Sequence, residues 1–410
     1  MITTTRIANG FQRSILAVDD ARSNLHLLVT LCSNHGYLVR SAASGVAALD
    51  QARHEPPDLI LLDIDMPDMN GFEVCEQLKD EPQLKSIPVI FISSFAEQME
   101  KVRAFAVGAV DYLTKPFEVE ELHARIATHL RLRDLQVQLE QANQHLANAN
   151  LRMRRDLKAA SRIQQTFLPN RPPKFPGIRF EWVFRPCDEL AGDGLNIIRL
   201  DESHVGVYVL DVSGHGVASA LFAVTLSRLL SASAEESSIL VQQRDGEAKA
   251  GITPPAEVVQ RLNQLFPLDP GTGQFATLLY GILNVCSGEF RFVSAGHPGP
   301  VHLRPGAPSE CSRCDGFPIG VHAGEYEEQI IRLQKEDRIY IYSDGIPEAM
   351  NPSRELFGME RFTEVLDQNE TQPLNQSVTS VLEAIADWQK SEQFRDDVSL
   401  LAIEIVDLVN

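Results

Sequence analysis

The chain has too little positive charge and too few long apolar runs for two large classes of protein. It contains 37 Lys and Arg against 56 Asp and Glu, a net charge of −19. Because this charge repels phosphate backbones and anionic lipid surfaces, we expect no nucleic acid and no membrane as partner. No uninterrupted apolar stretch could span a bilayer, and the opening MITTTRIANGF lacks the basic start and apolar core of a signal peptide. These absences predict a cytoplasmic protein.

Cysteine is also scarce, and its distribution argues against a disulfide framework. The six cysteines are scattered along the chain, which fits reduced thiols. Cys311 and Cys314 form a lone CxxC in the segment CSRCDG, and His302 and His322 lie nearby in the sequence. A zinc site is conceivable there, but the second ligand pair lacks the spacing of a zinc motif, so a plain loop is the favoured interpretation.

The first part of the chain alternates short apolar runs with helix-like stretches. A length of 410 residues suits two domains and a connector rather than one core. The alternation predicts an α/β fold with a doubly wound parallel sheet, whose ligands bind at the carboxyl ends of the strands. Acids and one lysine lie at those ends, a set that suits Mg²⁺ and an aspartyl-phosphate because both cations offset the phosphoryl charge. The runs are ILAVDD (15–20), LILLDIDMPDMNG (59–71), PVIFISS (88–94) and AVDYLTKPF (109–117).

These motifs resemble the receiver domain of two-component systems over residues 13–131. The resemblance implies a five-stranded sheet and a phosphoryl group that Asp63 accepts from a sensor histidine kinase. It also implies a Mg²⁺ ion, two residues that contact the phosphoryl oxygens, and an aromatic switch residue. The implied Mg²⁺ ligands are the side chains of Asp19, Asp20 and Asp63 with the Asp65 carbonyl; the phosphoryl contacts are Ser93 and Lys115, and the switch is Tyr112.

The second half of the chain carries aspartates in short motifs beside apolar runs. Carboxylates gathered from separate strand ends repel one another and cost stability unless divalent cations neutralise them. A pair of hard cations can then hold and deprotonate a water for attack on a phosphate ester. The pattern therefore predicts a two-metal hydrolase site. The motifs are AGD (191–193), DVSGHG (211–216), SDG (343–345) and RDD (395–397).

From about residue 160 to 408, the chain resembles the SpoIIE-like branch of the metal-dependent protein serine/threonine phosphatases, the PPM family. The motifs SRIQQTFLP (161–169), FATLLYGIL (275–283), SAGHPGP (294–300) and YSDGIPEA (342–349) strengthen the resemblance. It implies an α/β four-layer β-sandwich over residues 166–408 that holds two Mn²⁺ or Mg²⁺ ions. The implied roles are a bridging Asp211, a Val212 carbonyl that supports one ion, Asp344 and Asp396 on the second ion, and Asp193 as the residue that orients the attacking water.

Two positions depart from the pattern of relatives. Asn196 stands where the family usually has the second Asp of GGDxxD, and an amide holds a hard cation less well than a carboxylate. We therefore expect a weakened accessory-ion site near Asn196. Asp397 stands where distant relatives tend to have Asn, and we expect it to support the ligands rather than bind a metal. His215 and His297 could protonate a leaving group or could shape their loops.

Residues 132–165 predict a helical coiled-coil linker between the two domains. The chain has neither Pro nor Gly from Phe117 to Leu168, and good helix formers dominate. Apolar residues at alternating spacings of three and four form a seam that favours a parallel homodimer, and a helix packed on its own domain is the alternative. A stutter before Leu157 locally unwinds the supercoil. The seam is Leu132, Leu135, Leu139, Ala142, Leu146, Ala149 and Met153.

The combined motifs predict a response regulator that is also an enzyme. Phosphorylation of Asp63 would control a metal-dependent serine/threonine phosphatase, and family resemblance suggests a phosphorylated anti-sigma-factor antagonist as substrate. The alternative is a catalytically weak, phosphatase-like adaptor that binds a sigma-factor regulator. Asn196 favours the adaptor weakly, whereas the intact metal-site aspartates favour the enzyme.

Overall fold

The computed structural model describes residues 12–94, 98–169, 171–214, 216–231, 239–242, 251–268, 270–271, 273–322 and 324–408. The chain divides into two compact units, residues 1–150 and 151–410. One helix, α5 (Val119–Gln165), begins in the first unit and ends in the second. Within the described ranges, no helix is both long and apolar enough to cross a membrane.

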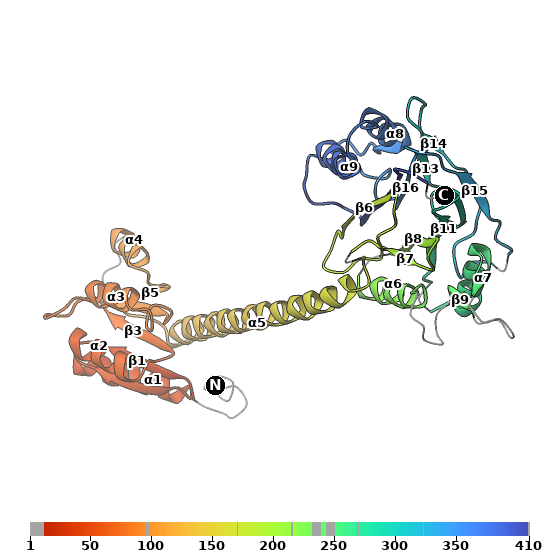
Figure 1. Ribbon diagram of the computed structural model, residues 1–410. Helices are drawn as coiled ribbons and strands as arrows, with labels where there is room; N and C mark the ends of the chain where they lie inside the picture. The colour runs from red at the N-terminus through yellow and green to blue at the C-terminus, as the bar shows by residue number, and fades with distance from the viewer. Residues whose placement is uncertain are drawn as a thin grey trace. The chain divides into compact units, whose positions relative to one another are not determined.

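The N-terminal unit is a five-stranded parallel sheet in the order β2-β1-β3-β4-β5, with helices on both faces (Figure 1). Every residue of β3 and β4 is buried, as expected of central parallel strands. One apolar core lies under α2, α3 and α4, and the other lies under α1 and α5. The predicted doubly wound fold is confirmed. The elements are β1 (Ser14–Val18), α1 (Arg22–Asn34), β2 (Leu38–Ala42), α2 (Gly45–His54), β3 (Leu59–Asp63), α3 (Gly71–Asp80), β4 (Val89–Ser93), α4 (Gln98–Ala106) and β5 (Asp111–Thr114).

The turn from β3 into α3 shows how local sequence positions the strand that ends in Asp63. Asn70 caps α3 by accepting from the Glu73 N–H at 3.0 Å, and Glu73 accepts from the Asn70 N–H at 3.0 Å. This reciprocal capping box satisfies two backbone donors at the start of the helix. Gly71 must be glycine, because an added Cβ would lie 2.3 Å from the Asp63 carbonyl oxygen. The helix start is therefore held tightly against the end of β3.

The C-terminal unit stacks two five-stranded antiparallel sheets between two pairs of helices (Figure 1). The first sheet, β15-β12-β11-β8-β7, is covered by α6 and α7, and the second, β14-β13-β16-β17-β6, is covered by α8 and α9. A third apolar core lies between the sheets. The predicted four-layer sandwich is confirmed. The main elements are β6 (Ile178–Arg185), β7 (Gly194–Arg199), β8 (His204–Val212), α6 (Val217–Leu229), α7 (Pro255–Leu265), β11 (Ala276–Asn284), β12 (Glu289–Ala295), β13 (Val301–Leu303), β14 (Glu310–Cys311), β15 (Gln329–Arg332), β16 (Arg338–Tyr342), α8 (Gly358–Gln368), α9 (Leu374–Gln389) and β17 (Val398–Ile405), with a small sheet of β9 (Val241–Gln242) and β10 (Gly251–Ile252).

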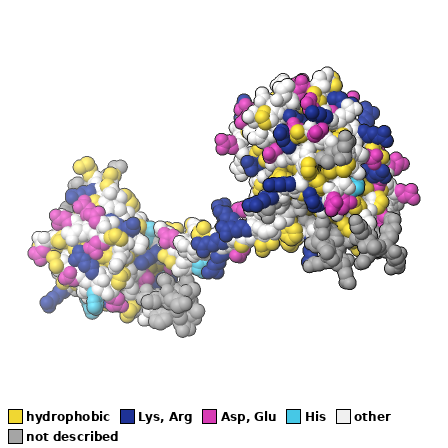
Figure 2. Space-filling view, viewed as in Figure 1, with side chains coloured by type: hydrophobic (Ala, Val, Ile, Leu, Met, Phe, Trp, Pro, Cys, Tyr) yellow, Lys and Arg dark blue, Asp and Glu magenta, His cyan; other side chains and the backbone are white. Residues whose placement is uncertain are grey.

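Helix α5 is continuous over 47 residues and carries an exposed apolar stripe. Residues 138–156 are exposed at every position, so this part does not pack on either unit. The alternative of a helix packed on its own domain therefore does not hold for residues 138–156. Figure 2 shows Lys and Arg side chains gathered over the later turns of α5. The apolar stripe consists of Leu132, Leu135, Leu139, Leu146 and Met153, and the basic residues are Arg152, Arg154, Arg155, Lys158 and Arg162.

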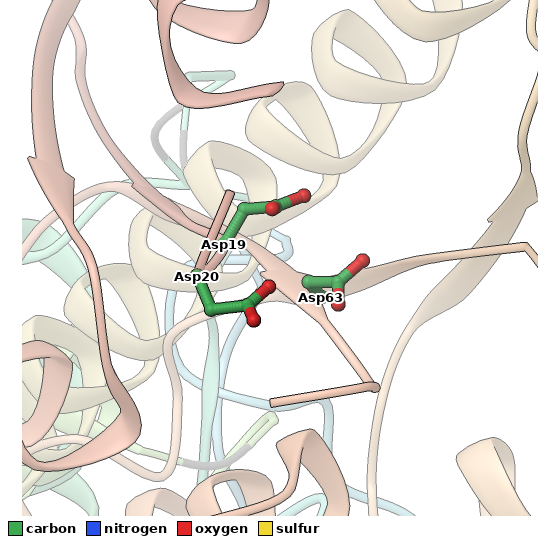
Figure 3. A group of neighbouring side chains, drawn as sticks. All are labelled: Asp19, Asp20 and Asp63. Carbon is green, nitrogen blue, oxygen red and sulfur yellow. The ribbon is translucent and has the colours of Figure 1, made fainter. Parts of the chain in front are cut away.

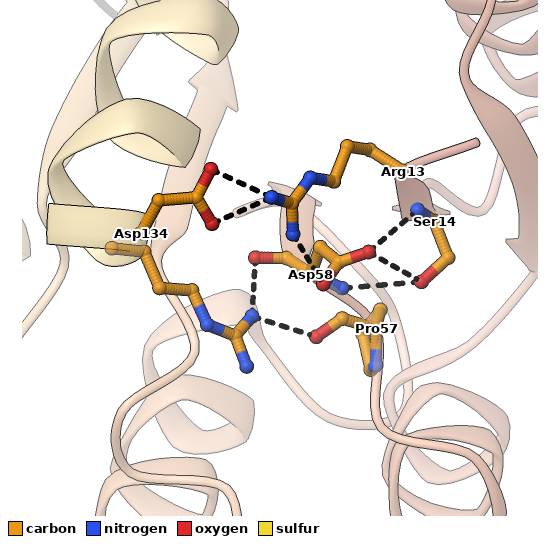
Figure 4. A network of polar contacts seen from close by, with 6 residues as sticks. Arg13, Ser14, Pro57, Asp58 and Asp134 are labelled. Carbon is orange, nitrogen blue, oxygen red and sulfur yellow. Dashed lines mark hydrogen bonds and ion pairs between the residues drawn. The ribbon is translucent and has the colours of Figure 1, made fainter. Parts of the chain in front are cut away.

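A polar network ties the first half of α5 to the base of the parallel sheet (Figure 4). Arg13 donates to both carboxylate oxygens of Asp134 at 2.6 Å and lies 3.5 Å from Asp58. Arg133 donates to the carbonyls of Pro57 and Asp58 at 3.0 and 2.5 Å. Because these contacts reach the turn before β3, the helix is anchored to the N-terminal unit as far as Asp134.

Candidate functional site

Three carboxylates of the N-terminal unit meet at the carboxyl ends of β1 and β3 (Figure 3). Asp19, Asp20 and Asp63 each offer an oxygen, and these oxygens lie within 4.8 Å of one another. Asp19 and Asp63 are buried, whereas Asp20 is exposed. Like charges this close repel one another unless a cation offsets them. The set therefore fits Mg²⁺, a hard cation that takes carboxylate oxygens and keeps several waters at a partly open site.

Lys115 supplies a fixed positive charge at the same place. Its Nζ donates to Asp19 Oδ2 at 2.7 Å and to Asp63 Oδ1 at 2.6 Å. Burial lowers the pKa of Lys115 and these hydrogen bonds raise it, with a net increase that keeps the ammonium charged. Burial raises the pKa of Asp63 more than Lys115 lowers it. A phosphoryl group on Asp63 would therefore meet a cation that is already in position.

The remaining predicted receiver residues surround this centre. Ser93 is fully buried at the end of β4, and its hydroxyl lies near enough to Tyr112 to lower the pKa of that phenol in part. Tyr112 is itself buried on the neighbouring strand β5. The Asp65 N–H donates to Asp63 Oδ2 at 3.0 Å, which places the Asp65 backbone beside the phosphoacceptor. The fold thus gathers every residue that the receiver resemblance singled out.

The aspartates of the C-terminal unit line a cavity of about 500 Å³. Asp211 comes from the end of β8 in one sheet, while Asp344 follows β16 and Asp396 precedes β17 in the other. Gly345 permits this meeting, because an added Cβ would lie 2.0 Å from the Asp397 carbonyl oxygen. Both sheets therefore contribute carboxylates to one open site.

These carboxylates disturb one another electrostatically. Burial and the charges of Asp344 and Asp396 raise the pKa of Asp211 to about 7. Burial and the charges of Asp396 and Glu348 raise the pKa of Asp344 to about 6. Among the described residues, only Asp19, Asp20 and Asp63 form a group of three acids whose oxygens all lie within 4.8 Å of one another. The acids of the C-terminal cavity are therefore spaced more widely. Mutual repulsion around a roomy, oxygen-lined space fits divalent cations.

Asp193 lies behind the cavity rather than in its wall. It is 3 % exposed, and Ser399 Oγ donates to its Oδ2 at 2.6 Å. Burial and the charges of Asp211 and Asp397 raise the pKa of Asp193 well above its usual value. Asp193 immediately precedes β7, whose first residue Gly194 pairs with Leu210, the neighbour of Asp211. Asp193 and Asp211 therefore lie at neighbouring strands of the same sheet.

Asp397 holds the backbone around this site. Its carboxylate accepts from the N–H groups of Cys187 at 2.8 Å and Gly192 at 2.7 Å. Both oxygens are thereby used on the segment that leads into Asp193. This arrangement agrees with the expected supporting position of Asp397.

Several residues at the cavity escaped the motif-based prediction. Asp188 and Arg395 line the cavity, and Ser399 holds Asp193 from inside β17. Arg395 is the first residue of the RDD motif, and its guanidinium group is suited to binding phosphate oxygens. The signal for Ser399 was a small polar residue inside the apolar strand VSLLAIEI. Burial of a hydroxyl in a strand requires a partner, and that requirement could have identified it.

Asn196 has a different environment from the one that the family pattern suggested. Its Nδ2 donates to the Phe167 carbonyl at 3.1 Å, and its Oδ1 accepts from the Ile197 N–H at 2.8 Å. The amide therefore binds the segment that follows α5. An accessory ion at this side chain would have to share its Oδ1 with the Ile197 N–H.

The motif histidines divide between a described and an undescribed position. His297 is 3 % exposed, its Nδ1 lies 2.8 Å from Thr277 Oγ1, and burial lowers its pKa to about 4. Thr277 pairs with Asp211 across β11 and β8 and lines the cavity. A buried neutral imidazole suits the loop-shaping alternative better than proton donation. His215 lies outside the described residues.

The CxxC segment does not assemble the conceived zinc site. His302 pairs with Asp337 at 3.0 Å, and the His322 ring packs on Phe317. Cys311 is an exposed free thiol on β14. Among the residues that the structure describes, these side chains form no group of three potential ligands, which leaves the loop interpretation.

Comparison with known families identifies both units. The family model of Stage II sporulation protein E (SpoIIE) matches residues 201–406, half of the chain. The family model of the response regulator receiver domain matches residues 15–127. A receiver domain is therefore fused to a SpoIIE-type phosphatase domain.

Curated relatives match over a limited stretch. Response regulator PleD of Caulobacter vibrioides is 40 % identical over 119 residues, which is 29 % of this chain and 26 % of that protein. The alkaline phosphatase synthesis transcriptional regulatory protein PhoP of Bacillus subtilis is also 40 % identical over 119 residues, 49 % of its length. The chain thus spans about a quarter to a half of these relatives.

A solved structure shares the fold of the second unit. The SiaA-PP2C domain of Pseudomonas aeruginosa superposes with a TM-score of 0.54 at 21 % identity and covers 63 % of this chain and 99 % of that domain. This likeness supports the sandwich fold alone. Taken with the two family matches, these findings show that the chain belongs to the SpoIIE family and carries a response regulator receiver domain in its N-terminal unit.

Proposed function

We propose that this protein is a metal-dependent phosphoprotein serine/threonine phosphatase whose activity is controlled by phosphorylation of Asp63. The observation that carries the proposal is the cavity lined by Asp211, Asp344 and Asp396, with Asp193 directly behind it. Family membership supplies the reaction class, and the gathered carboxylates supply residues suited to it. Serine/threonine specificity rests on the family resemblance.

The side chains divide the work at the phosphatase site. Asp211, Asp344 and Asp396, with the Val212 carbonyl, would hold two Mn²⁺ or Mg²⁺ ions. Such ions lower the pKa of water and offset charge on phosphoryl oxygens when bound. Asp193, fixed by Ser399, orients the attacking water. Arg395 lines the cavity and could contact a phosphate oxygen of the substrate.

The receiver centre is the proposed input. Asp63 would accept the phosphoryl group from a sensor histidine kinase, and Lys115 and Ser93 would contact its oxygens. Asp19, Asp20 and Asp63, with the Asp65 carbonyl, would hold Mg²⁺. Tyr112 lies on β5, the strand next to the one that ends in Ser93, so a phosphoryl group that recruits Ser93 would change the surroundings of the Tyr112 ring. Such a change is how the centre could alter the surface around β5.

Family resemblance also suggests the substrate: a small phosphorylated anti-sigma-factor antagonist. The output would then be control of a sigma factor by partner switching. The second candidate is a catalytically weak adaptor that binds a sigma-factor regulator. The departure at Asn196 favoured that adaptor, but its amide binds Phe167 and Ile197, which weakens the argument.

Turnover of a phosphoserine peptide tests the enzyme against the adaptor. The full-length protein should release phosphate with Mn²⁺ or Mg²⁺ and stop when a chelator is added. Asp211→Asn should lower kcat by at least about a hundredfold, because one of the carboxylates that would hold the ions is lost. Glu202→Gln removes an exposed acid from the bend that precedes the same strand and should change nothing. Full activity of Asp211→Asn would refute the assigned site, and an inactive wild type would favour the adaptor.

We further propose that α5 pairs with the α5 of a second copy. A second copy fits this helix because the exposed leucines repeat at heptad spacing, and the identical seam of another α5 would cover them. The residues after Met153 are rich in Lys and Arg, and like charges on two parallel helices repel one another. We therefore place the paired region between Leu132 and Met153. Light scattering should give a dimer for wild type and for Gln144→Glu, which lies off the seam. Leu139→Glu should give a monomer, and an unchanged dimer would contradict pairing through this seam.

A further inference from the structure

The last turn of α5 carries two neighbouring glutamines with opposite environments. Gln164 is 8 % exposed, whereas Gln165 is exposed. The Gln164 Nε2 donates to the Ala191 carbonyl at 2.6 Å, and the Ala191 N–H donates to Gln164 Oε1 at 3.2 Å. One side-chain amide thus pairs with both backbone groups of one residue, as a neighbouring strand would. A primary amide is suited to this because it offers a donor and an acceptor side by side.

Ala191 begins the loop that carries Asp193, so this contact acts on the candidate site. Ala191 is fully buried. The next residue, Gly192, donates its N–H to Asp397 Oδ2 at 2.7 Å and accepts from the Val212 N–H at 3.3 Å. The loop is therefore held from the start of β17, from the end of β8, and from α5. Of these three supports, Gln164 lies on the helix that begins in the receiver unit.

The end of α5 is also held directly after Gln164. The Phe167 carbonyl accepts from Asn196 Nδ2 at 3.1 Å, and Asn196 lies on β7, which Asp193 immediately precedes. Two side-chain amides therefore connect residues 164–167 with the segment 191–196. A rotation of the last turn by one residue, about 100°, would carry the Gln164 side chain away from Ala191.

We propose that Gln164 is a positioning residue whose amide sets the place of Asp193, and so couples the end of α5 to metal binding at Asp211. The inference rests on the proposed function and extends it by naming the residue through which the helix reaches the site. If Gln164 leaves Ala191, two buried backbone groups lose their partners, and the loop must move to regain them. Asp193 is two residues from Ala191 and immediately precedes β7, whose Gly194 pairs with Leu210 beside Asp211. Movement of the loop would therefore displace Asp193 relative to Asp211.

A substitution that keeps side-chain length but removes both hydrogen bonds tests this role. Gln164→Met in the full-length protein should raise amide exchange at Ala191 about tenfold or more. The dissociation constant for Mn²⁺, followed by the electron paramagnetic resonance of the free ion, should rise about tenfold, with kcat falling while KM stays within twofold. Gln165→Met, the exposed neighbour, should match wild type in every measurement.

The outcomes separate this inference from the proposed function. Unchanged exchange at Ala191 in Gln164→Met would overturn the contact, and faster exchange with unchanged Mn²⁺ affinity would overturn the positioning role. An inactive wild type would count against the proposed phosphatase activity. Amide exchange at Ala191 and the dissociation constant for Mn²⁺ would still test the positioning role of Gln164.

A measurement on the wild type covers the case in which Gln164→Met fails to fold. Exchange at Ala191 should differ by at least threefold between the unphosphorylated protein and the protein treated with acetyl phosphate, and Asp63→Ala should abolish the difference. Equal exchange in both states would overturn the coupling.

Discussion

The carboxylates of the C-terminal cavity repel one another, and bound divalent cations would offset this repulsion. Asp211 and Asp344 have pKa values raised to about 7 and about 6 by burial and by neighbouring charges. Ionised aspartates that are buried together oppose folding, and a cation that binds the folded state alone stabilises it by an amount that grows with the logarithm of its concentration relative to its dissociation constant. The site therefore links metal, pH and stability through the same residues.

The metal-free protein should lose stability as pH rises from about 4 to about 7. In the unfolded chain these aspartates ionise near 3.8, whereas the folded chain keeps its protons until about 6 to 7. The folded state binds more protons in this window, so the free energy of unfolding falls with rising pH. Thermal unfolding in chelator should show this slope, and Asp211→Asn should flatten it and raise the melting temperature at pH 7.

Added Mn²⁺ should reverse that trend. At pH 7 the carboxylates are free to bind the ion, whereas at pH 5 protons compete for them. The melting temperature should therefore rise more with Mn²⁺ at pH 7 than at pH 5. An equal rise at both values would place Mn²⁺ binding elsewhere.

His297 should act through structure and not through proton transfer. Burial lowers its pKa to about 4, below the ordinary 6.5, so the folded state disfavours its charged form. Its contribution is then present above pH 6.5 and is lost as pH falls toward 4. His297→Ala should destabilise the protein by about 2 to 4 kcal/mol, because a large buried side chain is truncated and Thr277 loses a partner. The pH dependence of kcat between 6 and 8 should keep its shape; a lost limb there would make His297 an acid after all.

At the scale of elements, α5 joins anchors at its two ends through an exposed middle. Arg133 and Asp134 contact the base of the parallel sheet, and Gln164 contacts the loop of Asp193. Residues 138–156 are exposed throughout and offer the units no other support. A rotation of one end of α5 relative to the other would therefore act on the contact between Gln164 and the loop of Asp193.

Inserting four residues after Ala149 tests the effect of such a rotation. Four residues turn the helix by about 400°, which leaves the ends about 40° out of phase and breaks the heptad. Acetyl phosphate should still label Asp63 and phosphatase activity should persist, but labelling should no longer change turnover.

An insertion of seven residues is the matched control. It restores the heptad to within about 20° and should preserve the dependence of turnover on labelling. If the four-residue insertion kept the same dependence, α5 would be a simple tether.

At the scale of the whole molecule, the two acidic centres should be chemically distinct. Asp63 should be the residue labelled by acetyl phosphate, with a bond that is base-labile as an acyl phosphate is, because Lys115 and a carboxylate group that could hold a metal ion adjoin it. Asp63→Ala should abolish labelling but leave metal-dependent turnover measurable. Equal labelling of Asp63→Ala would remove the receiver centre from the scheme.

The sequence alone predicted the order of the helices and strands and most of the acidic residues at the two candidate sites. Apolar runs such as β3 and β4 are buried at every residue, so their period and length indicate parallel strands directly. Acids at strand ends such as Asp63 and Asp211 follow, because strand ends of one sheet lie together. A long stretch without Pro or Gly likewise predicts α5, since helix propensity is local.

Tertiary structure alone decided which distant groups meet. Gln164 and Ala191 are 27 residues apart, and Gly192 and Asp397 are 205 apart, yet each pair shares a buried hydrogen bond. It also placed Asn196 on Phe167 and closed His297 off from solvent. Sequence patterns report spacing and polarity along the chain, but a hydrogen bond depends on the position and direction of two groups in space. Only the packing of the two sheets and of α5 brings those groups within reach.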